Sequence, residues 1–221
     1  MNATILVIAK EPVAGRVKTR LCPPCTADEA ACLASAALAD TCAAVAGTRA
    51  AGRAVALDGR PGPWIPPGFS VFEQVAGDRA DRLAAATAAV GGPVLVVGMD
   101  TPQLTAAQLD GALATLDAAG TDAVLGPATD GGYWSIGLRA PVREVFAGVA
   151  MSRPDTGAQQ LARLTALGLN TELLPELRDV DTIADAQVVA GDAPTTRFAA
   201  AFRALCGPGG RLAGSEVELA S

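Results

Sequence analysis

The sequence predicts a layered α/β fold, because strand-like apolar runs alternate along the chain with segments that carry helix signals. Residues 3–9 and 93–99 are apolar runs of strand length, as expected for strands buried on both faces of a mostly parallel sheet. The segments after Thr26 and Asp78 begin at polar N-cap residues and are long enough for helices. Half of the 221 residues are hydrophobic, which is enough for one well-buried domain and short for two.

The helix starts are the best-marked boundaries in the sequence. Thr26 is followed three residues later by Glu29, the spacing of a capping box. Asp78, Thr105 and Thr182 are the N-cap residues of three further predicted helices. In chain order, the predicted strands are 3–9, 53–57, 69–75, 93–100, 123–125, 133–138 and 169–174, and the predicted helices are 27–46, 79–90, 106–120, 141–146, 155–167, a short one from 183, and 194–205.

No internal repeat and no linker divides the chain, so residues 1–206 are expected to form a single domain, followed by a loose tail at 207–221. The first apolar run is too short to span a membrane, and the N-terminus lacks the charged start and cleavage pattern of a secretory signal. We therefore expect a cytoplasmic protein without a membrane partner. The sequence does not indicate an oligomeric state.

The composition excludes several classes of function. The formal net charge is −6 and the sequence pI is about 4.7, which argues against a general nucleic-acid partner. A small anionic ligand needs only a local basic cluster and stays compatible with this charge. The chain has no histidine, so Ser-His-Asp and Cys-His catalysis and histidine metal ligands are excluded.

Cys22 and Cys25 form a C-x-x-C motif, which is found in redox pairs and in zinc sites. The other three of the five cysteines supply no second C-x-x-C, and the motif follows a basic loop rather than a strand. We therefore expect reduced cysteines that act as small apolar or loop residues.

A loop rich in Pro, Gly and basic residues follows the first predicted strand. Arg16, Lys18 and Arg20 alternate, so an extended loop would point them to one side, where they could bind a polyphosphate. The loop matches neither the P-loop nor the dinucleotide-binding glycine pattern, and a solvated basic loop is the alternative. The predicted phosphate-binding residues are Lys10, Gly15, Arg16, Lys18, Thr19 and Arg20.

Acidic residues end two other segments. Asp100 follows the apolar run at 93–99, and Asp179 and Asp181 flank Val180 in a way that places both carboxylates on one face of an extended segment. Close carboxylates repel one another unless a cation joins them. We therefore predict that Asp100 and Asp181, assisted by Asp179, hold Mg²⁺ or Mn²⁺, which requires the first two carboxylates to lie within about 8 Å. A simple turn at Asp100 and a helix cap at Asp181 are the alternatives.

The segment 126–138 contains a Gly131-Gly132 pair that permits close backbone approach, with Asp130 beside it as an acceptor for hydroxyl or ammonium groups. Tyr133 and Trp134 offer flat apolar surface. A hairpin turn with two buried aromatic residues is the alternative interpretation.

Taken in order, AKEPVAGRVKTRL, QVAGDRADRL, GMDTP, GPATDGGYWSIGL and DVDT resemble bacterial GT-A superfamily proteins, which are glycosyltransferase-like and of unassigned activity. The same order of motifs is more distantly similar to 2-phospholactate guanylyltransferase and the molybdenum cofactor nucleotidyltransferases. The resemblance covers residues 4–190. It implies a GT-A fold, the Rossmann-like, three-layer α/β/α architecture of nucleotide-diphospho-sugar transferases, with a nucleotide in its N-terminal half.

The resemblance also implies residue roles. It places the basic loop on nucleotide phosphates and the three aspartates on a divalent ion. It implies catalytic roles for Asp100, Lys18 and Asp130. Relatives often carry Trp-Ser-Thr where this chain has Met151-Ser152-Arg153, and Leu-Gly where it has Arg79-Ala80, so both places depart from the pattern. Gln74, Gly77, Asp78 and Arg82 would border the base or ribose, and Asp130, Gly131, Gly132, Tyr133 and Ser152 would line the acceptor site.

Two reactions fit these expectations. In nucleotidyl transfer, an acceptor phosphate or hydroxyl attacks the α-phosphorus of a nucleoside triphosphate, whereas in glycosyl transfer a nucleotide sugar donates its sugar to a small acceptor. The basic loop and the lone Asp100, without a D-x-D, favour the first. The resemblance favours the second, with Asp130 as the base. A non-catalytic nucleotide sensor is a third hypothesis, and a dehydrogenase is disfavoured by the missing glycine pattern.

Overall fold

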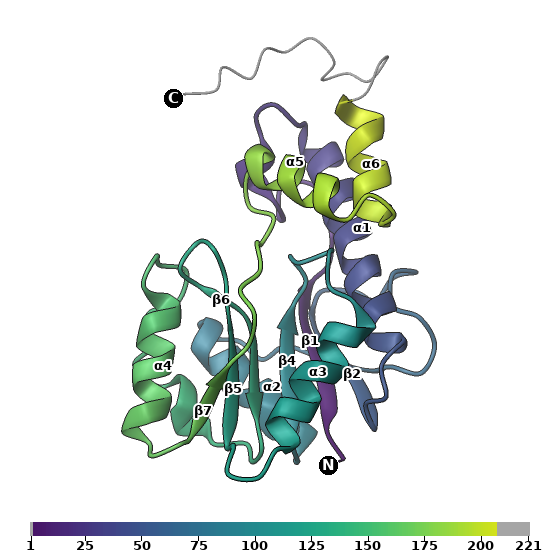
Figure 1. Cartoon of the computed structure of the whole chain (residues 1–221). Coiled ribbons are helices and arrows are strands. Elements are labelled where there is room, and N and C mark those ends of the chain that lie inside the picture. Colours follow the sequence, from purple (N-terminus) through teal and green to yellow (C-terminus); the bar gives the residue numbers. More distant parts are fainter. Residues whose placement is uncertain (1, 207–221) are drawn as a thin grey trace.

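The computed structural model describes residues 2–206 and shows a seven-stranded sheet with helices on both faces (Figure 1). The expected tail at 207–221 lies outside the described residues. The strands are β1 (Thr4–Lys10), β2 (Gly52–Asp58), β3 (Ser70–Glu73), β4 (Val94–Gly98), β5 (Ala123–Pro127), β6 (Tyr133–Leu138) and β7 (Thr171–Leu173). The helices are η1 (Thr19–Leu21), α1 (Ala27–Ala46), α2 (Arg79–Val90), α3 (Ala106–Asp117), η2 (Arg143–Phe146), α4 (Thr156–Ala166), α5 (Ile183–Asp192) and α6 (Arg197–Cys206), of which η1 and η2 are 3₁₀ helices.

The strand order is β3-β2-β1-β4-β6-β5-β7. Strand β6 is antiparallel to both of its neighbours, and the other strand pairs are parallel. This confirms the predicted mostly parallel sheet. The one reversed strand matters for the site, because it brings the start of β6 to the edge where β1 and β4 end.

The helices form two layers because successive residues of the strands face opposite sides. Ile5 and Val7 of β1 pack with α1 and α3, whereas Leu6 packs in the cluster that contains residues of α2, η2 and α4. Helices α5 and α6 pack on the far side of α1 with η1, beyond the end of the sheet (Figure 1). The three-layer prediction is therefore confirmed.

The predicted helix caps are present as capping boxes. Thr26, Asp78, Thr105 and Thr182 each accept a hydrogen bond from the backbone N–H three residues later, and the side chain at that later position accepts one in return. Each box satisfies backbone N–H groups that the first turn leaves without a helical partner.

The structure differs from the prediction at short elements. The expected helix 141–146 is only a 3₁₀ turn, η2, and Gly148 follows it with a φ of 76°, which ends the segment. The edge strands β3 and β7 are shorter than predicted, because each pairs with a neighbour on one side only. The turn η1 lies inside the segment expected to be an extended basic loop.

Helix α1 is long and apolar enough to cross a membrane by length and composition alone. Its mean hydropathy in the most apolar window is 1.4, and 56% of that window is buried within the structure. One side contributes Leu38 and Cys42 to the core under the sheet, and another contributes Leu33 and Ala37 to the cluster with α5 and α6. These contacts are those of a helix in the core of a folded domain.

The structure shows no disulfide among the five cysteines, all of which lie within residues 2–206. Cys25 is buried, and Cys22 packs against the same cluster as Cys25. Cys42 lies in the core, and burial raises the pKa of its thiol to about 12.

The attachment of α6 to α1 depends on Asp40. Its carboxylate is only 8% exposed and accepts hydrogen bonds from the backbone N–H groups of Arg197 and Phe198, at 3.1 and 2.8 Å. Asp40→Ala should lower the free energy of unfolding by about 1–3 kcal/mol, because it leaves buried N–H groups without an acceptor. Asp40→Asn keeps one acceptor oxygen, so its free energy of unfolding should fall between those of wild type and Asp40→Ala. Urea denaturation measures the difference, and an Asp40→Ala protein within about 0.5 kcal/mol of wild type would contradict the assignment.

Candidate functional site

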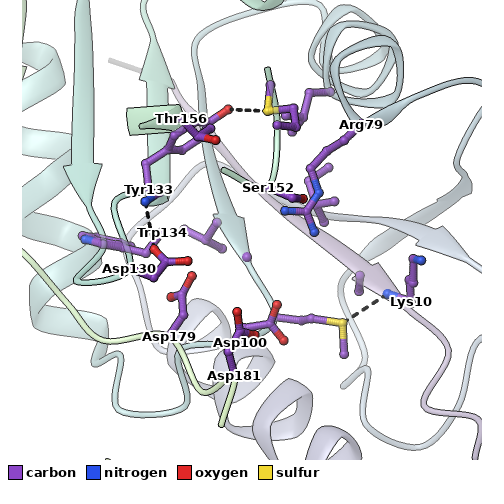
Figure 2. Close-up of a pocket in the computed structure, with 18 of the residues that line it drawn as sticks. Lys10, Arg79, Asp100, Asp130, Tyr133, Trp134, Ser152, Thr156, Asp179 and Asp181 are labelled. Carbon is purple, nitrogen blue, oxygen red and sulfur yellow. Dashed lines mark hydrogen bonds between the residues drawn. The ribbon is translucent and has the colours of Figure 1, made fainter. Parts of the chain in front are cut away.

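The carboxyl ends of β1 and β4 open onto a cavity of about 480 Å³ (Figure 2). Lys10 ends β1, Asp100 lies two residues after β4, and Tyr133 begins the reversed strand β6 at the same edge. The segment after β7 contributes Asp179 and Asp181 to the lining. Residues far apart in the sequence therefore meet where an open α/β sheet usually binds its ligand.

The segment at 178–181 is held against the end of β4 by backbone contacts. The N–H of Val180 donates to the carbonyl of Asp100 at 2.9 Å, and the Gln103 amide donates to the carbonyl of Arg178 at 2.6 Å. Val180 is fully buried. With Val180 fixed, the carboxylates of Asp179 and Asp181 on either side of it are both held at the cavity.

The ammonium group of Lys18 lies between the acidic residues. Its Nζ is 2.6 Å from Oδ1 of Asp100 and 3.4 Å from Oδ1 of Asp181, and it also donates to the carbonyl of Val180. Both carboxylate oxygens contact one nitrogen, so they lie well within the span of about 8 Å required for a shared ion. Burial opposes the charge of Lys18, but the carboxylates of Asp100, Asp181 and Asp179 outweigh it and raise the pKa of the ammonium.

Asp179 has the most perturbed acid group of the site. Burial, followed by the negative charge of Asp100, raises its pKa to about 7, and Lys18 only partly offsets this. Its Oδ1 is buried and has no hydrogen-bond partner within the part of the chain that the structure describes. A buried acceptor without a donor is costly and is typical of a position that a ligand, ion or water completes.

The carboxylate oxygens of these acidic residues are suitable ligands for a divalent ion, although the described residues are not arranged as a complete metal site. Among residues 2–206, no group of three or more Cys, Asp or Glu side chains has the spacing of a metal site. However, oxygens of Asp100 and Asp181 already converge on one cation, and Asp179 has an unpartnered oxygen beside them. Mg²⁺ commonly takes only one or two protein carboxylates and completes its shell with phosphate oxygens and water.

The basic loop is not extended, so its alternating side chains do not point to one side as predicted. Lys18 adopts a left-handed backbone conformation with a φ of 47°, immediately before η1. Lys18 and Arg20 both contact Asp181, whereas Arg16 lies against a different acid. Lys18 points to Asp100, Arg20 reaches Asp181 at 3.2 Å, and Arg16 turns to Asp58 at 3.6 Å. The side chains of Lys10, Arg16, Lys18, Thr19 and Arg20 all line the cavity, whereas Gly15 does not.

Of the four residues expected to border the base or ribose, only Gln74 lines the cavity. Its amide donates to the carbonyls of Ala9 and Ala56, which fixes it across the ends of β1 and β2. The others support the start of α2 and lie outside the lining. Asp78 caps the helix, Gly77 has a φ of 128° that suits glycine, and Arg82 donates to the Gly77 carbonyl and pairs with Asp58.

Arg79 lines the cavity, and the motif analysis singled it out only as a departure from the family pattern. Figure 2 shows its guanidinium near Ser152, across the cavity from Asp100, Asp179 and Asp181. The guanidinium of Arg79 forms no hydrogen bond or ion pair with another residue in 2–206. A charged residue at the first position of a helix looks like a solvated surface group in the sequence, so no sequence signal identified it.

The Gly131-Gly132 turn is built by close backbone packing. Oδ1 of Asp130 accepts from the N–H of Gly132 at 2.8 Å, and the N–H of Gly157 donates to the carbonyl of Gly131 at 2.8 Å. A Cβ on Gly131 would lie 1.8 Å from the carbonyl oxygen of Pro154. The turn therefore positions both Asp130 and the 151–155 segment, where Ser152 has a φ of 60°.

The two aromatic residues have different environments. Trp134 is buried and donates from its indole nitrogen to the carbonyl of Pro175 at 3.0 Å, so it is mainly a core residue. Tyr133 lines the cavity, and its hydroxyl lies 3.2 Å from the amide oxygen of Gln160. Burial raises the pKa of this hydroxyl, which makes Tyr133 a neutral hydrogen-bonding group rather than a base.

A comparison of two glycines tests the role of this turn. Gly131 and Gly148 have φ values of 86° and 76°, so alanine strains the backbone at both. Only at Gly131 does the new Cβ meet backbone atoms, since nothing lies within 4 Å at Gly148. Gly131→Ala should therefore lower the melting temperature more than Gly148→Ala, which is the control for strain alone. Equal shifts in thermal denaturation would show that the contact with Pro154 is unimportant.

Comparison with solved structures supports the architecture. A candidate nucleotide-diphospho-sugar transferase from Desulfovibrio desulfuricans G20 is 26% identical with a TM-score of 0.83, and the match covers 91% of this chain and 94% of that one. CMP:2-keto-3-deoxy-manno-octonic acid synthetase, solved with CTP, is 14% identical with a TM-score of 0.57, over 88% and 99% of the two chains. The manganese complex of Rv0371C from Mycobacterium tuberculosis H37Rv is 20% identical with a TM-score of 0.50, over 89% and 100%.

These neighbours share the α/β architecture expected of a GT-A-like protein, and the first two are described as a nucleotide-diphospho-sugar transferase and a synthetase. No curated protein sequence matches the chain. The model of the family DUF2064, described as uncharacterized proteins conserved in bacteria, matches residues 30–153. The matched region contains the QVAGDRADRL, GMDTP and GPATDGGYWSIGL segments, and the chain is therefore a GT-A-like member of the DUF2064 family.

Proposed function

We propose that this protein is a divalent-metal-dependent transferase that uses a nucleotide, and that it transfers a nucleotidyl group from a nucleoside triphosphate to a small phosphorylated or hydroxyl acceptor. The observation that carries the proposal is the convergence of Asp100 and Asp181 on one cation at the mouth of a cavity lined by further basic side chains. Carboxylates that bind a cation, next to positively charged side chains that attract an anion, suit the binding of a metal–polyphosphate complex.

Asp100 and Asp181 would hold the Mg²⁺ or Mn²⁺ ion, with Asp179 close enough to assist. When bound, the ion would neutralise charge on the phosphate oxygens. Lys10 and Arg79 face the same cavity without an ion pair to another described residue, so both have donors free for an anionic ligand. The protein would contribute positioning and charge stabilisation, which needs no histidine base.

The number of basic groups supports the nucleotidyl reaction, because a triphosphate has more charge to neutralise than a diphosphate sugar. The cationic side chains in the cavity lining are Lys10, Arg16, Lys18, Arg20, Arg79 and Arg153. The complex of a structural neighbour with CTP, and the manganese complex of another, agree with this proposal at the level of the fold.

Glycosyl transfer from a nucleotide sugar is the second candidate, favoured by the likeness to the Desulfovibrio protein. In that reaction Asp130, which is exposed at the cavity edge, would be the base, and Gly132, Tyr133 and Ser152 would face the acceptor. A nucleotide sensor without turnover would keep the cavity but give no product.

Nucleotide binding is tested by thermal shift with nucleoside triphosphates and nucleotide sugars, each with and without Mg²⁺. A ligand at about one hundred times its dissociation constant should stabilise the protein by about 2.7 kcal/mol. A metal-dependent shift with triphosphates, followed by pyrophosphate release when acceptors are added, is the expected result. Stabilisation by nucleotide sugars alone would favour glycosyl transfer, and no shift with any nucleotide would contradict the proposal.

Asp100→Asn tests the metal-dependent step. The substitution keeps the shape of the side chain and the backbone contact with Val180, so the fold should be retained. Metal-dependent turnover should be lost, because the amide cannot replace a charged ligand. Asp110→Asn is a matched control in α3, outside the cavity lining, where the carboxylate pairs with Arg49. Full metal-dependent activity of Asp100→Asn would contradict the proposed site.

The basic loop is tested by Lys18→Ala and Arg20→Ala. Each removes a charge-assisted contact worth about 1.5–3 kcal/mol, so nucleotide affinity should fall by roughly ten- to a hundredfold. Calorimetry with the nucleotide selected by thermal shift measures the change. Unchanged affinity in both variants would remove the phosphate role from this loop.

A further inference from the structure

Lys18 has no hydrogen-bonding capacity left for a nucleotide in this structure. An ammonium group has three donors, and Lys18 directs them to Asp100, Asp181 and the carbonyl of Val180. Its side chain is only 7% exposed. A phosphate could therefore not bind Lys18 until the side chain leaves this position, although the residue lies in the middle of the basic loop.

Lys18 also occupies the place that a metal ion needs. Its nitrogen contacts the same two oxygens, Oδ1 of Asp100 and Oδ1 of Asp181, that would ligate the ion. A divalent ion and an ammonium cannot occupy the same position between these oxygens, and two cations held a few ångströms apart repel. Binding of the metal and the present position of Lys18 therefore exclude each other.

We propose that Lys18 is an exchangeable counter-ion, which neutralises Asp100 and Asp181 when no metal is bound and is displaced when a metal–polyphosphate complex arrives. This inference rests on the proposed function of the site. The N–H donors of the released ammonium are then free to bind phosphate oxygens of the same ligand. Metal binding and lysine release are thus coupled, and the protein without nucleotide holds metal only weakly.

The local structure permits the exchange. Lys18 has a flexible four-carbon side chain, so its ammonium can move by rotation about side-chain bonds while the backbone turn before η1 stays in place. The cavity lies next to it and is lined by Lys18 itself. Arg20 differs in this respect, because its side chain is 70% exposed and already reaches Asp181 from the solvent side.

The test measures Mn²⁺ binding to the nucleotide-free protein by electron paramagnetic resonance, for wild type, Lys18→Met and Arg49→Met. Lys18→Met should bind Mn²⁺ about tenfold or more tightly than wild type, because the ion no longer displaces a charge-assisted contact. For each protein, the affinity for Mn²⁺–tripolyphosphate is divided by the affinity for Mn²⁺ alone. This ratio should be lower for Lys18→Met than for wild type, because the variant lacks the ammonium that contacts phosphate. Arg49→Met removes an equal charge from an exposed side chain that pairs with Asp110 outside the cavity lining, and it should change Mn²⁺ affinity by less than about threefold.

Equal or weaker Mn²⁺ binding by Lys18→Met, or an equal gain in Arg49→Met, would overturn the exchange. If Lys18→Met does not fold, wild-type protein decides the question through reductive methylation of Lys18 followed by mass spectrometry. Mn²⁺ alone should increase modification of Lys18 relative to the exposed Lys10, and no increase would overturn the inference. If wild type binds Mn²⁺–tripolyphosphate but neither Lys18→Met binds Mn²⁺ more tightly nor Mn²⁺ increases modification of Lys18, the exchange is wrong and the proposed function still stands. If wild type does not bind Mn²⁺–tripolyphosphate, the proposed function itself fails.

Discussion

The site depends on one electrostatic constraint, which is that Asp100 and Asp181 each place a carboxylate oxygen against the same cation. The ammonium of Lys18 meets this requirement in the structure, at 2.6 and 3.4 Å from the two carboxylates. Removing Lys18 from this partly buried arrangement is costly, because it leaves uncompensated charge. Burial, followed by the negative charge of Asp100, raises the pKa of Asp179, and Lys18 only partly offsets this.

The fold creates this constraint through its topology. Parallel strands β1 and β4 end at the same edge, and the antiparallel strand β6 starts there, so loops from distant parts of the sequence converge. The hydrogen bond from Val180 to Asp100 then fixes the last acidic segment against the end of β4. The sheet and its helices supply a rigid frame, and the reactive groups belong to the loops between them.

The sequence was sufficient to predict the layers, the helix starts and the positions of the acids. Capping residues such as Thr26 and buried runs such as β4 act locally, so their signals can be read from neighbouring residues. The course of the basic loop could not be predicted in this way. Lys18 takes a left-handed conformation in a turn, and its destination is a pair of carboxylates more than eighty residues away in the sequence.

Arg79 shows a similar limit. It faces the cavity because α2 begins beside the sheet edge, and the sequence alone does not indicate where that helix start lies relative to β6. Conversely, Gly77, Asp78 and Arg82 belong to a recognisable motif but serve the start of the helix in this structure, and their contact with a nucleotide stays a prediction. A motif therefore located the region, whereas the fold determined which of its side chains line the cavity.

The most direct test of the account is the location of Mn²⁺ in crystals grown with a nucleoside triphosphate, determined from anomalous scattering. The account predicts one ion that contacts carboxylate oxygens of both Asp100 and Asp181 at a little over 2 Å, bridges to phosphate oxygens, and leaves Lys18 turned away from the two aspartates. An ion bound elsewhere, or a nucleotide bound while Lys18 stays between Asp100 and Asp181, would contradict it.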